Sequence, residues 1–161
     1  MGISNRLIQG NRLKQLSYVL LGIIILQIAY GGLVAGLKAG DVSNTFPFMF
    51  GQWIPSGLFL SEKSWFLNLF TSDLTVHFIH RWLAFLVLAV TGLAYSILQR
   101  HETVPFMQRT ALAIFILVGC QVLLGLGVIL FSVPMPLALI HQGTGILVFS
   151  GAVFLAYQLH G

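Results

Sequence analysis

Residues 27–34 read QIAYGGLV and residues 121–128 read QVLLGLGV, so the spacing Gln-x3-Gly-x2-Val occurs twice in a chain of 161 residues. Each copy lies in a long apolar segment, which is followed by a turn and a second apolar segment. That second segment opens with Ile79-His80 in one case and with Ile140-His141 in the other. The repeat therefore predicts two related helix hairpins, each of which contributes one histidine.

The composition places these hairpins in a membrane. Hydrophobic residues make up 57% of the chain and charged residues 7%, whereas ordinary soluble domains are about 25% charged. Segments long enough to cross about 30 Å of hydrocarbon are predicted at residues 17–37, 74–98, 110–131 and 136–158. We therefore expect an all-α integral membrane protein, a four-transmembrane-helix bundle built from two pseudo-repeated helix hairpins, in one domain over residues 17–161.

The basic residues predict how the bundle is oriented. Five of the Lys and Arg side chains lie in the basic N-terminal segment, residues 1–16, or flank the loop between the second and third spans, whereas the outer loop, residues 38–73, holds two. The positive-inside rule then places both termini in the cytoplasm of a multi-pass protein in contact with lipid. The net charge of +4 follows from this topology and does not indicate nucleic-acid binding.

Cysteine chemistry is limited by the single cysteine, Cys120. One cysteine excludes an intrachain disulfide, a CxxC redox motif and a thiolate-bound iron–sulfur cluster. Because Cys120 falls in the middle of the third span, we expect it to be a small packing residue.

His80 and His141 are predicted to share one depth in the membrane. Thr71, Ser72 or Asp73 can cap the second span and Pro136 suits the first turn of the fourth. Both histidines then lie roughly 8–10 Å below the outer surface at 1.5 Å per residue. Ionisable residues inside a membrane are costly and mark functional sites. Two imidazoles at one depth are what a haem iron with two histidine ligands requires; the alternative is a pair of hydrogen-bonded packing residues.

Several polar residues accompany the pair. Arg81 is the only Lys or Arg within a span, and it could bind a haem propionate or anchor the end of its helix. His77 lies one turn before His80 and could be a hydrogen-bond donor to the site, a proton carrier or a solvated interfacial residue. Gln27 and Gln121 are amides in the middle of the membrane, for which we expect interhelical hydrogen bonds.

The outer loop is rich in aromatic residues of the kind found at the membrane–water interface. It is expected either to lie over the outer ends of the helices, shielding the haem edge, or to form an aromatic belt without contact to a ligand. These residues are Phe46, Phe48, Phe50, Trp53, Phe59, Trp65, Phe66 and Phe70.

With these features in place, the chain resembles a known family, the haem A synthases, from Gln27 to Tyr157. The elements that carry the resemblance are, in chain order, Gly32-Leu33-Val34-Ala35-Gly36-Leu37-Lys38-Ala39-Gly40, Asn44-Thr45-Phe46-Pro47, Met49, Gly51, Trp53-Ile54-Pro55, His80-Arg81, Gln121 through Gly125, Val133-Pro134 and Leu137-Ala138-Leu139-Ile140-His141-Gln142.

This resemblance implies a cofactor, a reaction and a location. Family members usually have eight spans in two homologous halves, and this chain resembles the C-terminal half, in which His80 and His141 would hold a haem b. The family oxidises a methyl group of haem O to the formyl group of haem A for terminal oxidases, so a prokaryotic plasma membrane is implied. His77 occupies the position at which the other half carries a glutamate, which makes it the candidate catalytic residue.

The resemblance leaves the assembly and the activity of this chain open. A half-length chain could form a homodimer or pair with a separate N-terminal-type half, and haem O synthase is a candidate partner. The cysteine pair often found in the outer loop of the other half is absent. The alternative to a haem A synthase-like oxidoreductase is therefore a non-catalytic b-type haem-binding or electron-transfer membrane subunit.

Overall fold

Helices make up nearly all of the protein, whose computed structural model describes the backbone of residues 3–58, 64–100 and 105–160 and the side chains from residue 11 onward. The described part contains no β-strand, and four of its helices are long and apolar enough to cross a membrane. The expected all-α membrane bundle is thereby confirmed. The elements are α1 (Ile3–Gly36), the 3-10 helix η1 (Ala39–Val42), α2 (Trp65–Thr71), α3 (Asp73–Arg100), α4 (Pro105–Leu130) and α5 (Met135–His160).

Local sequence signals explain where the helices begin. The Ser72 hydroxyl accepts a hydrogen bond from the Thr75 amide at 3.3 Å, and Asp73 supplies an acidic first turn, both of which stabilise the start of α3. Pro136 is the second residue of α5, where its missing N–H costs nothing. The helices match the four predicted spans and extend beyond them mainly at their N-terminal ends; α1 begins already at Ile3.

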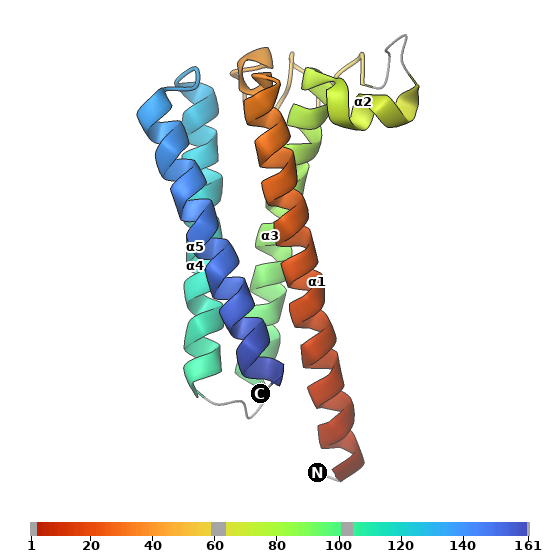
Figure 1. The fold of residues 1–161 in the computed structure, drawn as a ribbon, viewed down its shortest axis with the longest axis vertical. Coiled ribbons are helices and arrows are strands. Elements are labelled where there is room, and N and C mark those ends of the chain that lie inside the picture. The colour runs from red at the N-terminus through yellow and green to blue at the C-terminus, as the bar shows by residue number, and fades with distance from the viewer. Residues whose placement is uncertain (1–2, 59–63, 101–104, 161) are drawn as a thin grey trace.

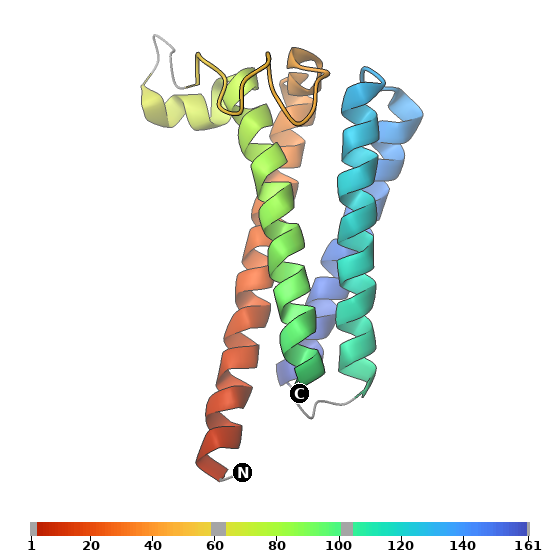
Figure 2. The ribbon, with the colours of Figure 1, turned by 180° about the vertical axis from the view of Figure 1, so that it is seen from behind.

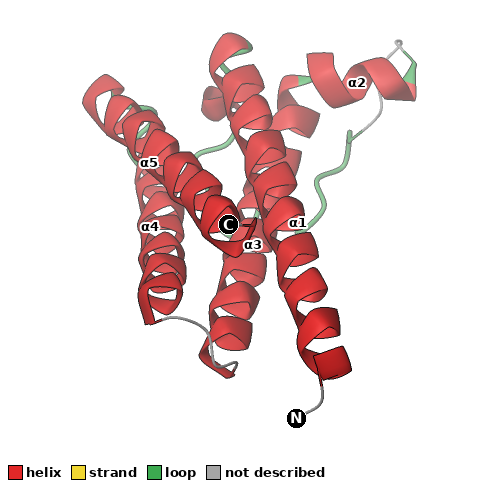
Figure 3. Cartoon of the chain, turned by 60° about the horizontal axis from the view of Figure 1, so that its bottom comes forward, coloured by secondary structure: helices red, strands yellow, loops and turns green. Residues whose placement is uncertain are grey.

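The four long helices form a bundle in which each packs against two neighbours. The extensive contacts join α1 to α3 and α5, and α4 to α3 and α5, so α3 and α5 lie at opposite corners. Figure 1 shows the α1–α3 pair beside the α4–α5 pair, with both termini at one end, and Figure 3 shows the same arrangement from the terminal end. At the other end α2 runs across the bundle axis (Figures 1 and 2).

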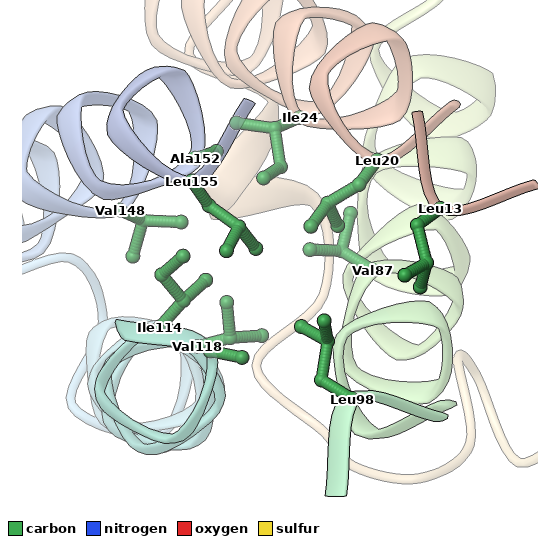
Figure 4. Packing of buried hydrophobic residues seen from close by; sticks show 11 residues of the cluster. Leu13, Leu20, Ile24, Val87, Leu98, Ile114, Val118, Val148, Ala152 and Leu155 are labelled. Atoms are coloured by element: carbon green, nitrogen blue, oxygen red, sulfur yellow. The ribbon is translucent and has the colours of Figure 1, made fainter. Parts of the chain in front are cut away.

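Apolar packing is concentrated in the half of the bundle that contains the termini. The cluster draws on all four long helices (Figure 4) and comprises Leu13, Leu20, Ile24, Val87, Leu98, Ala111, Ile114, Val118, Val148, Ala152 and Leu155. A Cβ on Gly151 would lie 3.0 Å from Ile114 Cγ1, so α4 and α5 approach closely there. Van der Waals packing of this kind holds membrane helices together and fixes the frame on which the other half is built.

Cys120 departs from its expected role. Its side chain is exposed on α4, whereas the sequence suggested a packing residue in the interior. Ile114 and Val118, on the turns before it, point into the apolar cluster instead. The position in mid-span was predicted correctly, but one cysteine among apolar neighbours gives no information about which face of a helix it occupies.

Candidate functional site

His80 and His141 occupy the half of the bundle that the apolar cluster leaves free. His80 comes from α3 and His141 from α5, the two helices at opposite corners. Both side chains are half-buried, and the two imidazoles are close enough for their charges to interact. The fold therefore brings together, from opposite corners, the two residues that the repeat singled out.

Each imidazole packs against a glycine of the neighbouring helix. A Cβ built on Gly31 of α1 would lie 3.2 Å from Cε1 of His80, and one built on Gly125 of α4 would lie 3.1 Å from Cε1 of His141. Both distances are tighter than ordinary carbon–carbon contact. The glycine of the repeated motif thus gives the ring its place, because a larger residue would push the imidazole away.

The glutamine of the repeated motif holds the backbone at the same histidine. Gln27 Nε2 donates to the carbonyl oxygen of His80 at 3.2 Å, and Gln121 Nε2 donates to that of His141 at 2.7 Å. These bonds confirm the interhelical role expected for the two amides. The glutamine and the glycine are four residues apart and lie on one helix face. In each motif the glutamine therefore bonds the backbone of the neighbouring helix, and the glycine contacts the imidazole of that helix one turn further on.

The ring nitrogens of the two histidines fit an axial-ligand role. Nδ1 of each imidazole is buried and makes no hydrogen bond of ordinary geometry within the described residues. A buried ring nitrogen without a hydrogen-bond partner is costly, and binding of the imidazole to a metal ion would account for it. The described hydrogen bonds do not support the alternative of two hydrogen-bonded packing residues.

The described residues hold no larger cluster of metal-binding side chains. No group of three or more His, Cys, Asp or Glu side chains comes together within residues 3–58, 64–100 and 105–160. Two facing imidazoles suit an iron whose other four ligands come from a porphyrin. The donor set that is present therefore fits a haem.

Arg81 and His77 form a buried polar group beside the pair. Arg81 Nε donates to His77 Nε2 at 3.0 Å, while Nη1 donates to the Thr45 carbonyl and Nη2 to the Ser43 carbonyl, both at 2.8 Å. His77 is 1% exposed and Arg81 8%. His77 is thus not a solvated interfacial residue, and Arg81 fastens the start of the outer loop to α3.

The outer loop divides into two parts. The 3-10 helix η1 contacts α1, α3 and α4, and Gly40 lies against Val133 of the α4–α5 connection, so this part covers the outer end of the bundle. Phe46 and Trp53 pack instead on Phe85 and Trp82 of α3, across which the loop runs in Figure 2. Of the other aromatic residues expected to matter, Phe59 lies outside the described residues.

Comparisons with known proteins identify relatives of the chain. A family model described as cytochrome oxidase assembly protein matches residues 3–153. The chain is 41% identical to a heme A synthase of Bartonella tribocorum over 81% of its own length and 36% of the relative. It is 36% identical to one of Parvibaculum lavamentivorans over 98% of its own length and 44% of the relative. The chain thus spans less than half the length of these curated relatives. No solved structure matches it.

Substitution of Gly31 and Gly125 tests whether their close contacts with the imidazoles are needed for haem binding. Gly31→Ala and Gly125→Ala should each lower the affinity of the purified protein for haem by about tenfold, the usual size of an effect on the surroundings of a metal ligand. Alanine favours a helix by about 1 kcal/mol over glycine, so thermal stability without haem should not fall. Gly32→Ala and Gly119→Ala are matched controls, because a Cβ there meets nothing within 4 Å. Equal haem binding in all four variants would contradict the proposed contact.

Proposed function

Because the chain belongs to the haem A synthase family of cytochrome oxidase assembly proteins, we propose that it holds a haem b between His80 and His141 and takes part in oxidising haem O to haem A. The observation that carries the proposal is the duplicated arrangement in which glutamine, glycine and histidine meet across two helix pairs. A structural role alone would not require the same set of contacts to be made at both histidines.

The residues of the site have separable tasks in this proposal. Gln27 and Gln121 fix the backbone at the ligands, and Gly31 and Gly125 let the rings approach the neighbouring helices. A haem with two imidazole ligands supplies electron transfer rather than oxygen binding, since both axial positions are filled. In this proposal the four helices would hold the haem as an electron carrier, and the methyl group of haem O would be oxidised to the formyl group elsewhere in the assembly.

Arg81 can serve a haem propionate as well as the outer loop. A guanidinium has five N–H groups, and three of them donate to His77, Ser43 and Thr45. The remaining two, one on each terminal nitrogen, have no partner among the described residues. A buried cation is costly unless an anion pairs with it, and a propionate carboxylate would supply that anion.

His77 is proposed to position Arg81 rather than to carry a proton. Its Nε2 lone pair already accepts the hydrogen bond from Arg81 Nε. Protonation of that nitrogen would set two N–H groups against each other, so His77 could act as a base only after Arg81 had moved. His77, which the sequence offered as the candidate catalytic residue, is therefore proposed to be a positioning residue for Arg81.

Ligation can be tested through the absorption spectrum. The purified protein should show a low-spin b-type spectrum, and His80→Ala and His141→Ala should each abolish it, because either change leaves the iron one ligand short. His160→Ala is the matched control, since that ring bonds only to the Ala156 carbonyl of its own helix and packs on Tyr18 at the terminal end. Unchanged spectra in both ligand variants would refute the haem site.

The proposed contact of Arg81 with a propionate is tested by comparing a variant that removes the charge with one that keeps the charge and changes the shape of the side chain. Arg81→Leu should lower the midpoint potential of the haem, because loss of a nearby cation favours the oxidised iron, and should weaken haem binding by about tenfold, as expected for a charge-assisted hydrogen bond. Arg81→Lys keeps the charge and should retain most of the potential while losing the two-point contact with the loop. If the leucine variant has the wild-type potential, Arg81 serves the loop alone.

The proposal extends to orientation and assembly. The protein is a multi-pass membrane protein, and we propose that both termini lie in the cytoplasm, with the histidine pair in the outer leaflet of the plasma membrane. One unit offers one histidine pair, whereas conversion of haem O requires a second porphyrin site. The active form would then be a homodimer, two-fold symmetric about the membrane normal, or a complex with an N-terminal-type half, with haem O synthase as the neighbouring enzyme.

Mass measurement in nanodiscs, together with a haem O conversion assay, tests this assembly. We expect haem A to form only in preparations that contain two four-helix units. A monomer that converts haem O unaided would disprove the need for two units. A homodimer that binds haem b but yields no haem A would instead assign this chain to the haem-binding, electron-transfer class.

A further inference from the structure

A hollow lies between α3 and the outer loop, on the side of α3 away from the histidine pair. Its volume is about 340 Å³, which falls within the range of small-molecule sites. Its lining consists of Phe46, Pro47, Met49 and Trp53 from the loop and Phe78, Arg81, Trp82 and Phe85 from α3.

Helical geometry separates this hollow from the haem site. At about 100° per residue, Phe78, Trp82 and Phe85 lie on the face of α3 roughly opposite His80. A ligand in the hollow and a ring bound to His80 would therefore stand on either side of a single helix, about 10 Å apart. The hollow is not a part of the histidine site.

The walls of the hollow are aromatic rings set for stacking. Phe46 and Phe85 are stacked with centroids 6.1 Å apart, and Trp82 lies 6.0 Å from Phe85 and 6.3 Å from Trp53. Trp82 is 45% exposed and Phe85 36%, so a molecule dissolved in the lipid can reach these faces. Rings of this kind favour a flat conjugated partner over a flexible chain, because stacking adds to the gain from burial.

Arg81 gives the hollow one polar edge. Arg81 is 8% exposed and lines the hollow. One N–H on each of its terminal nitrogens has no partner among the described residues. Because these two N–H groups belong to different nitrogens, a propionate on one side and a ligand in the hollow need not compete. The hollow therefore suits a ligand with an apolar ring and an oxygen atom that accepts a hydrogen bond from Arg81.

We propose that the hollow binds the head group of a membrane quinone, with a ring carbonyl oxygen accepting a hydrogen bond from Arg81. This inference rests on the proposed function, which releases electrons that a lipid-soluble oxidant must accept. Oxidation of a methyl to a formyl group, with water as the oxygen source, removes four electrons and four protons. Two quinones take these up and leave as two quinols, so atoms and electrons balance.

Binding of a quinone can be measured without any turnover. The full chain in nanodiscs is titrated with a benzoquinone that carries a ten-carbon tail, and tryptophan fluorescence is recorded. Trp53 and Trp82 line the hollow, whereas Trp65 lies on α2 and is 69% exposed. Saturable quenching is expected. Phe85→Ala and, independently, Phe46→Ala should weaken the affinity by about tenfold, while Phe154→Ala, a comparably exposed phenylalanine on α5, should change it less than about twofold.

Two results would overturn the proposal. Wild-type affinity in both Phe85→Ala and Phe46→Ala would show that the quinone binds elsewhere. Equal displacement of the quinone by decanol, which has the tail but no ring, would identify the hollow as a lipid-chain groove. The outcome is separate from that of the proposed function, because a chain that binds quinone in the hollow but never supports haem A formation confirms the site and refutes the enzymatic assignment.

Discussion

The structure depends on a close approach between helices that only glycine permits. At Gly31 and at Gly125 the space that a Cβ would occupy is taken by an imidazole of the facing helix. The hydrogen bond from the glutamine one turn earlier fixes the backbone that carries this imidazole. A hydrogen bond and a steric contact are thus paired on one helix face, and the pair occurs twice, once for each histidine.

This arrangement explains why the two halves of the bundle differ. The half that contains the termini is held by interdigitated apolar side chains such as Ile114 and Leu155. In the outer half the buried residues include Thr75, His77 and Arg81, which are costly in hydrocarbon unless they find partners. Here hydrogen bonds from Gln27, Gln121 and Arg81 to backbone carbonyls add to the packing of buried apolar residues such as Val76 and Met49.

Sequence reasoning located the site but did not show how it is built. The spans, the histidine pair and the membrane amides followed from hydropathy, duplication and the cost of burying polar groups. The contact between Gly125 and His141 did not follow, because a repeated glycine predicts a close approach without naming the group that makes it. The bonds from Arg81 to Ser43 and Thr45 were also out of reach, since they join residues 36 and 38 positions apart through backbone atoms, which carry no sequence signal.

Arg81 contacts both the loop that follows η1 and the aromatic face of α3, neither of which belongs to the repeated motif. It stands on the helix between His80 and the aromatic face of Trp82 and Phe85, and it also holds the loop that covers that face. The corresponding residue after His141 is Gln142, which is exposed, so the second hairpin has no cation at this position. The two hairpins therefore share the glutamine and glycine contacts to a histidine, whereas the cation next to the histidine and the loop bonded to it belong to the first. The asymmetry leaves Arg81, Trp82 and Phe85 on a face of α3 that contacts the loop and takes no part in the repeated contacts.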